Sequence, residues 1–317
     1  MLTPNLDCAA ETQRIEQFIR HTVARTLNRR GAVLGVSGGV DSAVCAALAA
    51  RAVGAGRVKA LLMPEREASD DGRARAERLC RQLEIPYRTE DITAGLVAVG
   101  CYSQRDEAIR KVFPAYGPGW RNKIALAGNG GGTPWFNLVV ESPAGERMCR
   151  RMPHDVYLQV VAANNWKQRL RKGTEYYHAE RLNYAVIGTP NRLEYALGFF
   201  VRGGDGLADL KPIAHLYKTQ VYALAEYLGV PEEIRSQLPS TDTYSLPQTQ
   251  EEFYFALPYG EADHLLHSMD AGIDPGLAGE ELGLKSDQVN IVWRDFAGKQ
   301  RLAQRTLREA ITIEDES

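Results

Sequence analysis

Apolar residues follow two patterns that alternate along the chain and predict strands followed by helices. Mostly apolar runs bounded by turn residues predict short strands at 31–36, 58–63 and 184–188, and 87–92 is expected to be a further strand. Apolar residues spaced three or four apart predict helices at six places: 11–27, 43–53, 70–83, 164–182, 192–197 and 219–228. Such alternation predicts an α/β fold, a doubly wound parallel sheet with helices on both faces. Residues 252–312 have a mainly helical pattern and predict a helical C-terminal region.

The segment 97–151 interrupts this alternation. Glycine and proline cluster at 116–120 and 128–132, and the run 135–141 is β-like. A structureless loop of this length is unusual in a compact domain, so we expect a strand pair or another ordered excursion. The chain is therefore expected to be one domain, 1–317, with an inserted segment at about 97–151.

Composition limits the classes of protein to which this domain can belong. The 317 residues are 44% hydrophobic and 25% charged, as in ordinary globular proteins. The 38 basic and 40 acidic residues give a net charge of −2, without the basic excess typical of nucleic-acid binding. Neither a signal peptide nor a run of roughly 18 apolar residues is present, so no membrane association is expected. Five widely spaced cysteines without a Cys-x-x-Cys pair favour a reducing cytoplasm: Cys8, Cys45, Cys80, Cys101 and Cys149.

The strongest chemical signal is the loop Ser37-Gly-Gly-Val-Asp-Ser42, which lies between a predicted strand and a predicted helix. Its two glycines let the backbone turn sharply and approach a ligand closely. The N–H groups at the start of the helix, with the helix dipole, favour an anion such as a phosphate. The hydroxyls of Ser37 and Ser42 add donors, and Asp41 is placed to hold a divalent cation against phosphates. The Gly-Lys-Ser/Thr ending of a Walker A loop is missing.

This hexapeptide resembles the pyrophosphate loop of the N-type ATP pyrophosphatases. The order and spacing of the motifs in the second half of the chain resemble those of ammonia-dependent NAD⁺ synthetase. These motifs are Asn165-Trp-Lys-Gln-Arg-Leu-Arg171, Gly188-Thr189 with Glu194, Gly204-Asp205-Gly206 with Asp209, Pro212-Ile-Ala-His-Leu-Tyr-Lys218, Leu228-Gly-Val-Pro-Glu232 and Pro239-Ser-Thr-Asp242. The resemblance covers about 15–301, apart from the inserted segment. It implies the adenine nucleotide alpha hydrolase-like form of the α/β fold and a homodimer. It also implies the reaction: ATP adenylates a carboxylate, that of nicotinate adenine dinucleotide, and ammonia then displaces AMP to form NAD⁺.

The resemblance also implies roles for individual residues. ATP contacts are expected at Gly35, Val36, Ser37, Gly38, Gly39, Val40, Asp41, Ser42, Met63, Thr189, Lys218 and Ser240. Asp41 and Glu194 are the expected Mg²⁺ ligands, and Asp41, Lys218 and Asp205 are the expected catalytic residues. Without the family, Glu194 would be a solvated first-turn residue and Lys218 a surface lysine.

The expected contacts of the acid substrate are Asn165, Arg169, Arg171, Arg202, Asp205 and Asp209. On a helix, Asn165 and Arg169 share a face with Lys172, whereas Arg171 points elsewhere, toward a neighbouring subunit or a surface pair. Asn165 and Arg169 are therefore expected to be the better contacts. Asp205 is expected to help remove a proton from ammonium.

Departures from the family pattern lie on the acid-substrate side. Val201-Arg-Gly-Gly-Asp205 stands where the family has Thr-Lys-Tyr-Gly-Asp, Gln250-Glu251 replaces an Asp-Glu pair, and Gly298-Lys-Gln-Arg301 replaces a His-Lys-Arg signature. The same adenylation and amidation of a different carboxylic acid is therefore the main alternative. A tRNA-modifying pyrophosphatase is disfavoured by the absent Cys-x-x-Cys and the near-neutral charge. A non-enzymatic ATP-binding protein is disfavoured because nucleotide binding alone does not require Asp41, Glu194 and Lys218 together.

Overall fold

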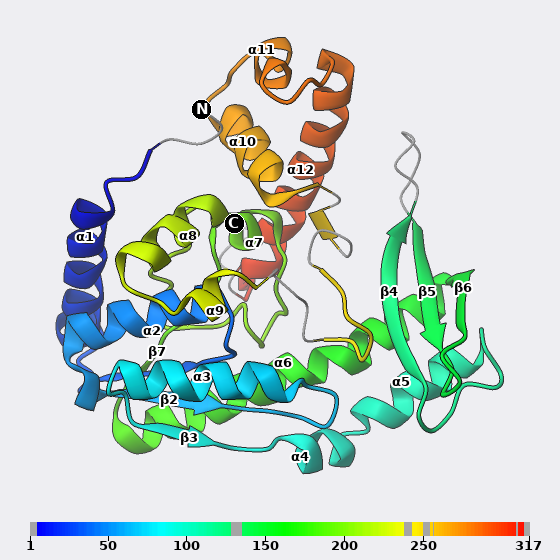
Figure 1. Cartoon of the computed structure of the whole chain (residues 1–317), viewed down its shortest axis with the longest axis horizontal. Helices are drawn as coiled ribbons and strands as arrows, with labels where there is room; N and C mark the ends of the chain where they lie inside the picture. The colour runs from blue at the N-terminus through cyan, green and yellow to red at the C-terminus, as the bar shows by residue number, and fades with distance from the viewer. Residues whose placement is uncertain are drawn as a thin grey trace.

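A four-stranded parallel sheet organises the molecule. The computed structural model describes residues 5–127, 135–237, 243–249, 254–255, 257–308 and 310–313. The strands are short: β1 (Ala32–Gly35), β2 (Val58–Leu62), β3 (Tyr87–Thr89) and β7 (Ala185–Val186). They lie side by side in the order β3-β2-β1-β7 (Figure 1). All neighbouring pairs are parallel, with Ala32 opposite both Val58 and Ala185. The expected doubly wound parallel sheet is confirmed.

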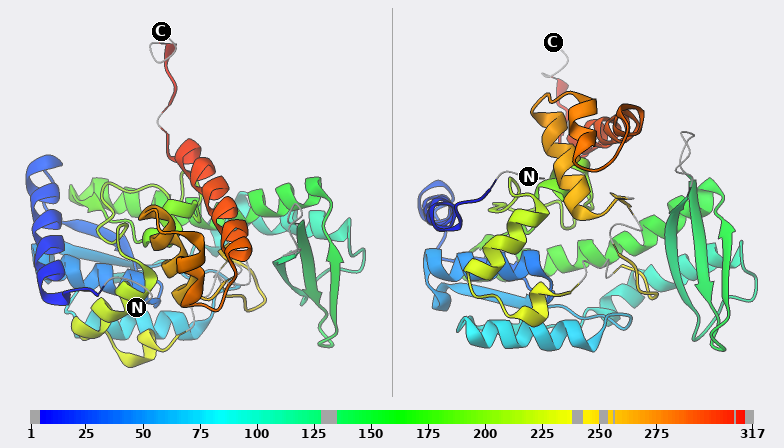
Figure 2. Two further views of the ribbon diagram at one scale, coloured as in Figure 1. Left: turned by 90° about the horizontal axis from the view of Figure 1, so that it is seen from above. Right: turned by 45° about the horizontal axis from the view of Figure 1, so that its top comes forward.

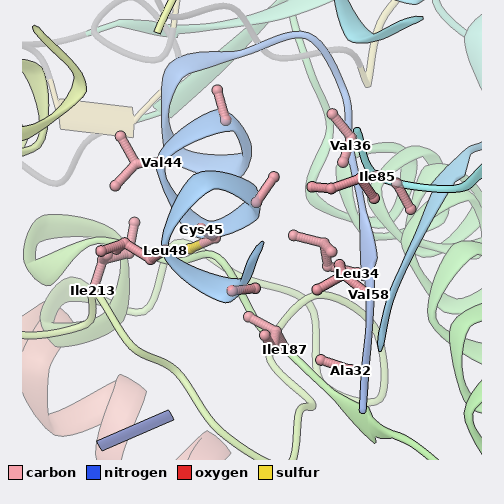
Figure 3. Close-up of a cluster of buried hydrophobic side chains, with 14 of the residues drawn as sticks. Ala32, Leu34, Val36, Val44, Cys45, Leu48, Val58, Ile85, Ile187 and Ile213 are labelled. Atoms are coloured by element: carbon pink, nitrogen blue, oxygen red, sulfur yellow. The ribbon is translucent and has the colours of Figure 1, made fainter. Parts of the chain in front are cut away.

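The alternation of side chains along these strands creates two apolar faces. Ala32 and Leu34 of β1 pack with α2 (Val40–Val53), as the cluster in Figure 3 shows. Val33 points to the opposite face and packs in a cluster that includes Ala179 of α6 (His154–Leu182). Because both faces of the sheet are covered there, the central strand β1 and its neighbour β7 consist almost entirely of apolar residues, whereas β3 at the edge is more exposed.

The face of the sheet to which Ala32 and Leu34 point is covered by helices that lie close to the ranges predicted for them. They are α1 (Cys8–His21), continued by a π-helical turn (Thr22–Thr26), α2, α3 (Asp70–Gln82), α8 (Lys218–Tyr227) and α9 (Glu232–Arg235), with a 3₁₀ turn (Ala55–Arg57) before β2. The other face is covered by α4 (Thr93–Ala98), α5 (Cys101–Arg110) and α6. The predicted range 164–182 was too short, because α6 begins at His154. Its additional turns bury Val156 and Val160 in a separate cluster.

The segment 97–151 has structure of its own, as expected. It contains α5 and an antiparallel sheet of β4 (Arg121–Ala127), β5 (Trp135–Glu141) and β6 (Arg147–Arg151). This sheet lies beside the N-terminal part of α6, away from the parallel sheet (Figures 1 and 2). The third strand had no sequence signal, because β6 is an edge strand whose residues are mostly exposed and polar.

A helical layer follows the α/β part, as predicted for the described residues beyond 252. It consists of α10 (Tyr259–Asp270), α11 (Pro275–Glu280) and α12 (Ser286–Leu307). These helices form an apolar cluster with α7 (Arg192–Leu197), to which Leu193, Leu197 and Phe296 contribute. The cluster packs α7 against α10 and α12 (Figure 1).

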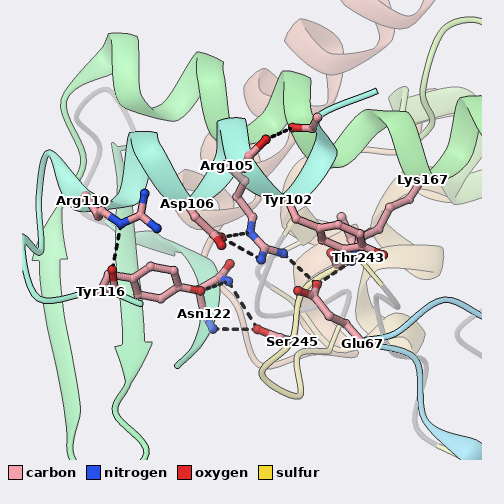
Figure 4. A network of polar contacts seen from close by, with 12 residues as sticks. Glu67, Tyr102, Arg105, Asp106, Arg110, Tyr116, Asn122, Lys167, Thr243 and Ser245 are labelled. Atoms are coloured by element: carbon pink, nitrogen blue, oxygen red, sulfur yellow. Dashed lines mark hydrogen bonds and ion pairs between the residues drawn. The ribbon is translucent and has the colours of Figure 1, made fainter. Parts of the chain in front are cut away.

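A buried ion network joins α5 and α6 to the loop after β2. The Lys167 ammonium donates to Glu65 at 3.0 Å, to Glu67 at 2.8 Å and to the Thr243 carbonyl at 3.1 Å. Arg105 binds the same Glu67 oxygen at 2.7 Å (Figure 4). Burial by itself raises the pKa of Glu67, but Arg105 and Lys167 outweigh burial and lower it to about 2. The network therefore ties the inserted segment to the parallel-sheet part of the domain.

Two further predictions can be compared with the described residues. No helix among them is both long and apolar enough to cross a membrane. All five cysteines are free thiols, and Cys45, Cys80 and Cys101 are buried like small apolar residues.

Candidate active site

The loop 37–42 forms a tight turn between β1 and α2. Gly38 has a φ of +87°, and a Cβ at this position would lie 2.3 Å from the carbonyl oxygen of Gly72. Only glycine fits both restrictions. The Ser42 hydroxyl donates to the Gly39 carbonyl at 3.0 Å, and the Ser37 hydroxyl accepts from the Gly39 N–H at 3.2 Å. The two serine hydroxyls therefore help hold the turn, which leads directly into the first N–H groups of α2.

Asp41 and Lys218 form an ion pair beside this loop. Lys218 begins α8, is 1% exposed, and donates through Nζ to Asp41 Oδ2. Asn191 Nδ2 donates to the other Asp41 oxygen at 3.2 Å. Burial by itself lowers the pKa of the Lys218 ammonium, but Asp41 and Glu194 outweigh burial and raise it. Lys218 is therefore a buried cation, not the surface lysine that its sequence position alone would suggest.

Asp263 of α10 accepts hydrogen bonds from the backbone at the start of α8, where Lys218 lies. Its carboxylate accepts the N–H of Lys218 at 3.2 Å and the N–H of Thr219 at 2.8 Å, which caps α8. Burial raises the pKa of Asp263 to about 6, although these hydrogen bonds oppose the change. No local pattern pointed to Asp263, because it lies 45 residues from its partner.

Asn191 forms hydrogen bonds with both Asp41 and Glu194 and so links the two carboxylates. Glu194 Oε2 accepts the N–H of Asn191 at 3.2 Å, and Asn191 Oδ1 accepts the N–H of Glu194 at 3.1 Å, a reciprocal capping box at the start of α7. Asp41 and Glu194 both raise the pKa of the buried Cys45 thiol, after burial itself as the larger cause. The described residues contain no group of three or more His, Cys, Asp or Glu that could hold a metal. Two carboxylates facing a phosphate loop nevertheless fit a hard divalent ion that takes its other ligands from phosphate and water.

One cavity of about 670 Å³ connects the loop with α6. Most of the expected site residues line it: Gly35, Val36, Ser37, Gly38, Gly39, Val40, Asp41, Ser42, Met63, Asn165, Arg171, Thr189, Glu194, Asp205 and Lys218. Arg169, Arg202 and Asp209 are not among its lining residues. Ser240 lies outside the described residues.

The face that α6 presents to the cavity differs from the predicted one. The cavity is lined by Asn164, Asn165, Gln168, Arg171, Lys172 and Glu175, a stripe with helical spacing. Arg171 therefore lines the cavity, contrary to the expectation that it points elsewhere, whereas the substrate contact expected at Arg169 stays a prediction. Arg169 instead donates to the Arg202 carbonyl at 3.3 Å on an exposed part of the surface. The sequence pattern missed Glu175, whose carboxylate binds the Lys172 ammonium at 2.5 Å and would lie 2.9 Å from a Cβ at Gly35.

The two aspartates of the 204–209 region have different surroundings. Asp205 lines the cavity, its carboxylate accepts the Val201 N–H at 2.7 Å, and burial raises its pKa. Asp209 instead accepts the Val186 N–H at 2.7 Å and the Tyr176 hydroxyl at 3.2 Å. Asp209 thus supports β7 and does not line the cavity, and its expected contact with the acid substrate stays a prediction.

Comparison with known proteins agrees with this geometry. The model of the NAD synthase family matches residues 11–112 and 146–299. The chain belongs to the NAD synthase family. It is 52% identical over 298 residues to the NH₃-dependent NAD⁺ synthetase of Rhizobium rhizogenes, covering 93% of this chain and 90% of that protein. It is 32% identical over 294 residues to the enzyme of the same name from Methanosarcina mazei, covering 91% and 93%.

Solved structures support the fold of this NAD synthase family member. The structure of NMN synthetase from Francisella tularensis has a TM-score of 0.67 at 23% identity, covering 97% of this chain and 99% of that one. The NH₃-dependent NAD synthetase from Campylobacter jejuni has a TM-score of 0.62 at 22% identity, covering 98% and 100%. The resemblance inferred from the ordered motifs is therefore confirmed at the level of family and fold.

Proposed function

We propose that this protein is an ammonia-dependent NAD⁺ synthetase that amidates nicotinate adenine dinucleotide. The observation that carries the proposal is the identity of about half the residues, over nearly the whole chain, with a protein of that name. In the proposed reaction, the nicotinate carboxylate attacks the α-phosphorus of ATP and pyrophosphate leaves. Ammonia then attacks the acyl carbon of the adenylate and AMP leaves.

The ATP half of the cavity suits the first step. The N–H groups at the start of α2 can bind the departing pyrophosphate, and Lys218 can neutralise its developing charge. Lys218 is already held at the loop by Asp41 and Asp263. Preorganised charge of this kind costs little reorganisation during the reaction. Lys218 and Asp41 are therefore our catalytic candidates on this side.

We further propose that Asp41 and Glu194 hold Mg²⁺ when ATP is bound. The bound ion would supply charge neutralisation on the phosphates. Asn191 keeps both carboxylates at the mouth of the loop. Thr189 and Met63 line the same part of the cavity and are proposed ATP contacts.

The acid half is proposed to use Asn165, Arg171 and Asp205. Arg171 offers a cation to a phosphate or carboxylate of the acid substrate. Asp205 accepts the proton that ammonium must lose before it attacks the adenylate. Its raised pKa supports that role, because a buried carboxylate is the stronger base.

The test is direct. Protein, ATP, Mg²⁺, ammonium and nicotinate adenine dinucleotide are incubated, and AMP, pyrophosphate and NAD⁺ are measured. Equal amounts of the three products support the proposal. AMP released only with another carboxylate would replace this function by amidation of that acid. Asp41→Ala is expected to abolish pyrophosphate release while the far-ultraviolet circular dichroism spectrum is unchanged.

The family resemblance also supports three statements about the protein as a whole. We propose a homodimer, a cytoplasmic location, and a single domain over 1–317 with an inserted segment at about 97–151. Light scattering after size-exclusion chromatography tests the first, since a mass of one chain would contradict it.

A further inference from the structure

Residues 243–249 contribute to the cavity wall although they belong to no helix or strand. Thr243 and Tyr244 are among the lining residues of the cavity. Buried and more exposed residues alternate along the segment, since Tyr244, Leu246 and Gln248 are buried. This alternation is typical of an extended chain that packs on one side. An extended segment cannot pair its own backbone groups, so other parts of the fold must pair them and fix its position.

The edge of the inserted sheet (β4, β5 and β6) supplies these partners. β4 is an edge strand, because the strand order is β4-β5-β6. The N–H of Asn122 in β4 donates to the Ser245 hydroxyl at 2.9 Å, and its carbonyl accepts the N–H of Leu246 at 3.0 Å. Two residues farther along β4, the carbonyl of Ile124 accepts the side-chain amide of Gln248. Segment 243–249 therefore covers the open edge of β4, as an additional strand would.

The side chain of Asn122 adds to this contact. It is fully buried, and its Nδ2 donates to the Ser245 hydroxyl at 3.3 Å and to the Tyr116 hydroxyl at 2.8 Å (Figure 4). Tyr116 is itself buried in the apolar cluster of the inserted segment, to which Tyr244 also belongs. The inserted segment therefore holds Asn122 in the orientation in which it meets Ser245.

The beginning of segment 243–249 is attached to α6. Lys167 donates to the Thr243 carbonyl at 3.1 Å, so the segment lies against the helix that carries Asn165 and Arg171, the proposed contacts of the acid substrate. This part of the cavity wall is thus held from two directions, by α6 at Thr243 and by β4 at Ser245. A displacement of only about 1 Å among positioning groups can cost about 10²-fold in rate.

We propose that the inserted sheet holds segment 243–249 in place as a wall of the active-site cavity, with Asn122 as a positioning residue that acts through Ser245. Asn122 does not line the cavity itself. Its partner Tyr116 and all of β4 lie within residues 113–145, which the family model leaves unmatched. The added sheet thereby contributes to turnover at a distance. This inference rests on the proposed function, which supplies the reaction to be measured.

Ser245→Ala tests the proposal, because it removes the hydroxyl that accepts both hydrogen bonds of Asn122. It is expected to lower kcat/KM for nicotinate adenine dinucleotide about 10-fold, since the wall faces the helix proposed to bind that acid. The KM for ATP should stay within about twofold, because the loop 37–42 has its own hydrogen bonds. Ser245→Thr keeps a hydroxyl and should retain most of the activity. A merely structural hydroxyl would change the Tm and leave kcat/KM of the folded protein unaltered.

Two further variants complete this series. Ser142→Ala is the matched control, since the Ser142 hydroxyl accepts the N–H of Glu146 at 3.2 Å in the turn between β5 and β6. It removes a comparable hydrogen bond from the same sheet and should leave kcat/KM unchanged. Asn122→Ala combined with Ser245→Ala should lose less kcat/KM than the product of the two single losses, because both residues act through one contact. Independent, multiplicative losses would contradict the proposed route through Ser245.

Hydrogen–deuterium exchange of peptides within 243–249 tests the attachment of the segment without relying on turnover. Exchange there should be about 10-fold faster in Ser245→Ala and unchanged in Ser142→Ala. Unchanged exchange in Ser245→Ala overturns the attachment, whether or not the enzyme is active. Faster exchange with an unaltered kcat/KM, or an equal loss of kcat/KM in Ser142→Ala, overturns the positioning role and leaves the proposed function intact. A wild type that forms no NAD⁺ overturns the function, while faster exchange confined to Ser245→Ala still supports the attachment of the segment to β4.

Discussion

Replacing Lys218 by methionine separates the stabilising role of the Asp41–Lys218 pair from its catalytic role. Methionine keeps the apolar stem of the side chain and removes the ammonium. Asp41 then loses its cationic partner and keeps the hydrogen bond from the Asn191 amide. We expect this single change to reduce both the stability of the fold and the rate of adenylation.

The two effects have different magnitudes. Breaking a buried ion pair costs about 3–5 kcal/mol. Asp41 is 17% exposed and Lys218 only 1%, so the carboxylate left behind is partly hydrated and the lower end of that range, about 3 kcal/mol, is expected. Loss of one preorganised charge at a transition state lowers kcat by about 10²- to 10³-fold.

The assay combines urea unfolding with pyrophosphate release. The double variant Asp41→Asn/Lys218→Met removes the uncompensated charge, so it should regain much of the lost stability and remain inactive. Lys111→Met is the control, because Lys111 is an exposed lysine 3.6 Å from Asp155 and should change stability by less than about 1 kcal/mol. A Lys218→Met protein within threefold of wild-type kcat would refute the catalytic role. Recovery of activity together with stability in the double variant would refute it as well.

Three further predictions follow from the geometry. Gly38→Ala should destabilise the protein by several kcal/mol and weaken ATP binding in calorimetry, while Gly56→Ala, at a position with open space around it, should change neither. Arg171→Ala should raise the KM for the acid dinucleotide by about 10-fold or more, whereas equal KM increases for Arg169→Ala would contradict the orientation of α6. Glu67, whose pKa falls from 4.5 to about 2 on folding, contributes about 3 kcal/mol above pH 4.5 that is lost as the pH falls toward 2. Glu67→Gln should lower the unfolding free energy at pH 7 and flatten its decline below pH 4.5; an unchanged decline would exclude the assignment.

Sequence patterns were sufficient for the parts of this protein that depend on neighbouring residues. The parallel strands follow from continuous apolar runs such as 31–36, since a strand covered on both faces needs apolar residues on both. The loop 37–42 follows from the glycine at position 38, because no other residue accepts that backbone conformation beside Gly72. The family could be inferred from the order of the motifs along the chain, and the match to the family model confirms it.

Only the tertiary structure decided which side chains meet. Helical spacing shows which residues share a face with Arg169 or with Arg171. The packing of α6 on the sheet decides which of these faces lines the cavity, and it is the face with Arg171. Asp263 caps α8 across 45 residues, a pairing that no local pattern encodes. In the same way, Phe136 and Asn164 come together only because the inserted sheet packs beside α6. Local sequence determines the elements and the anion-binding turn, whereas the polar partners and the shape of the cavity arise from contacts between distant segments.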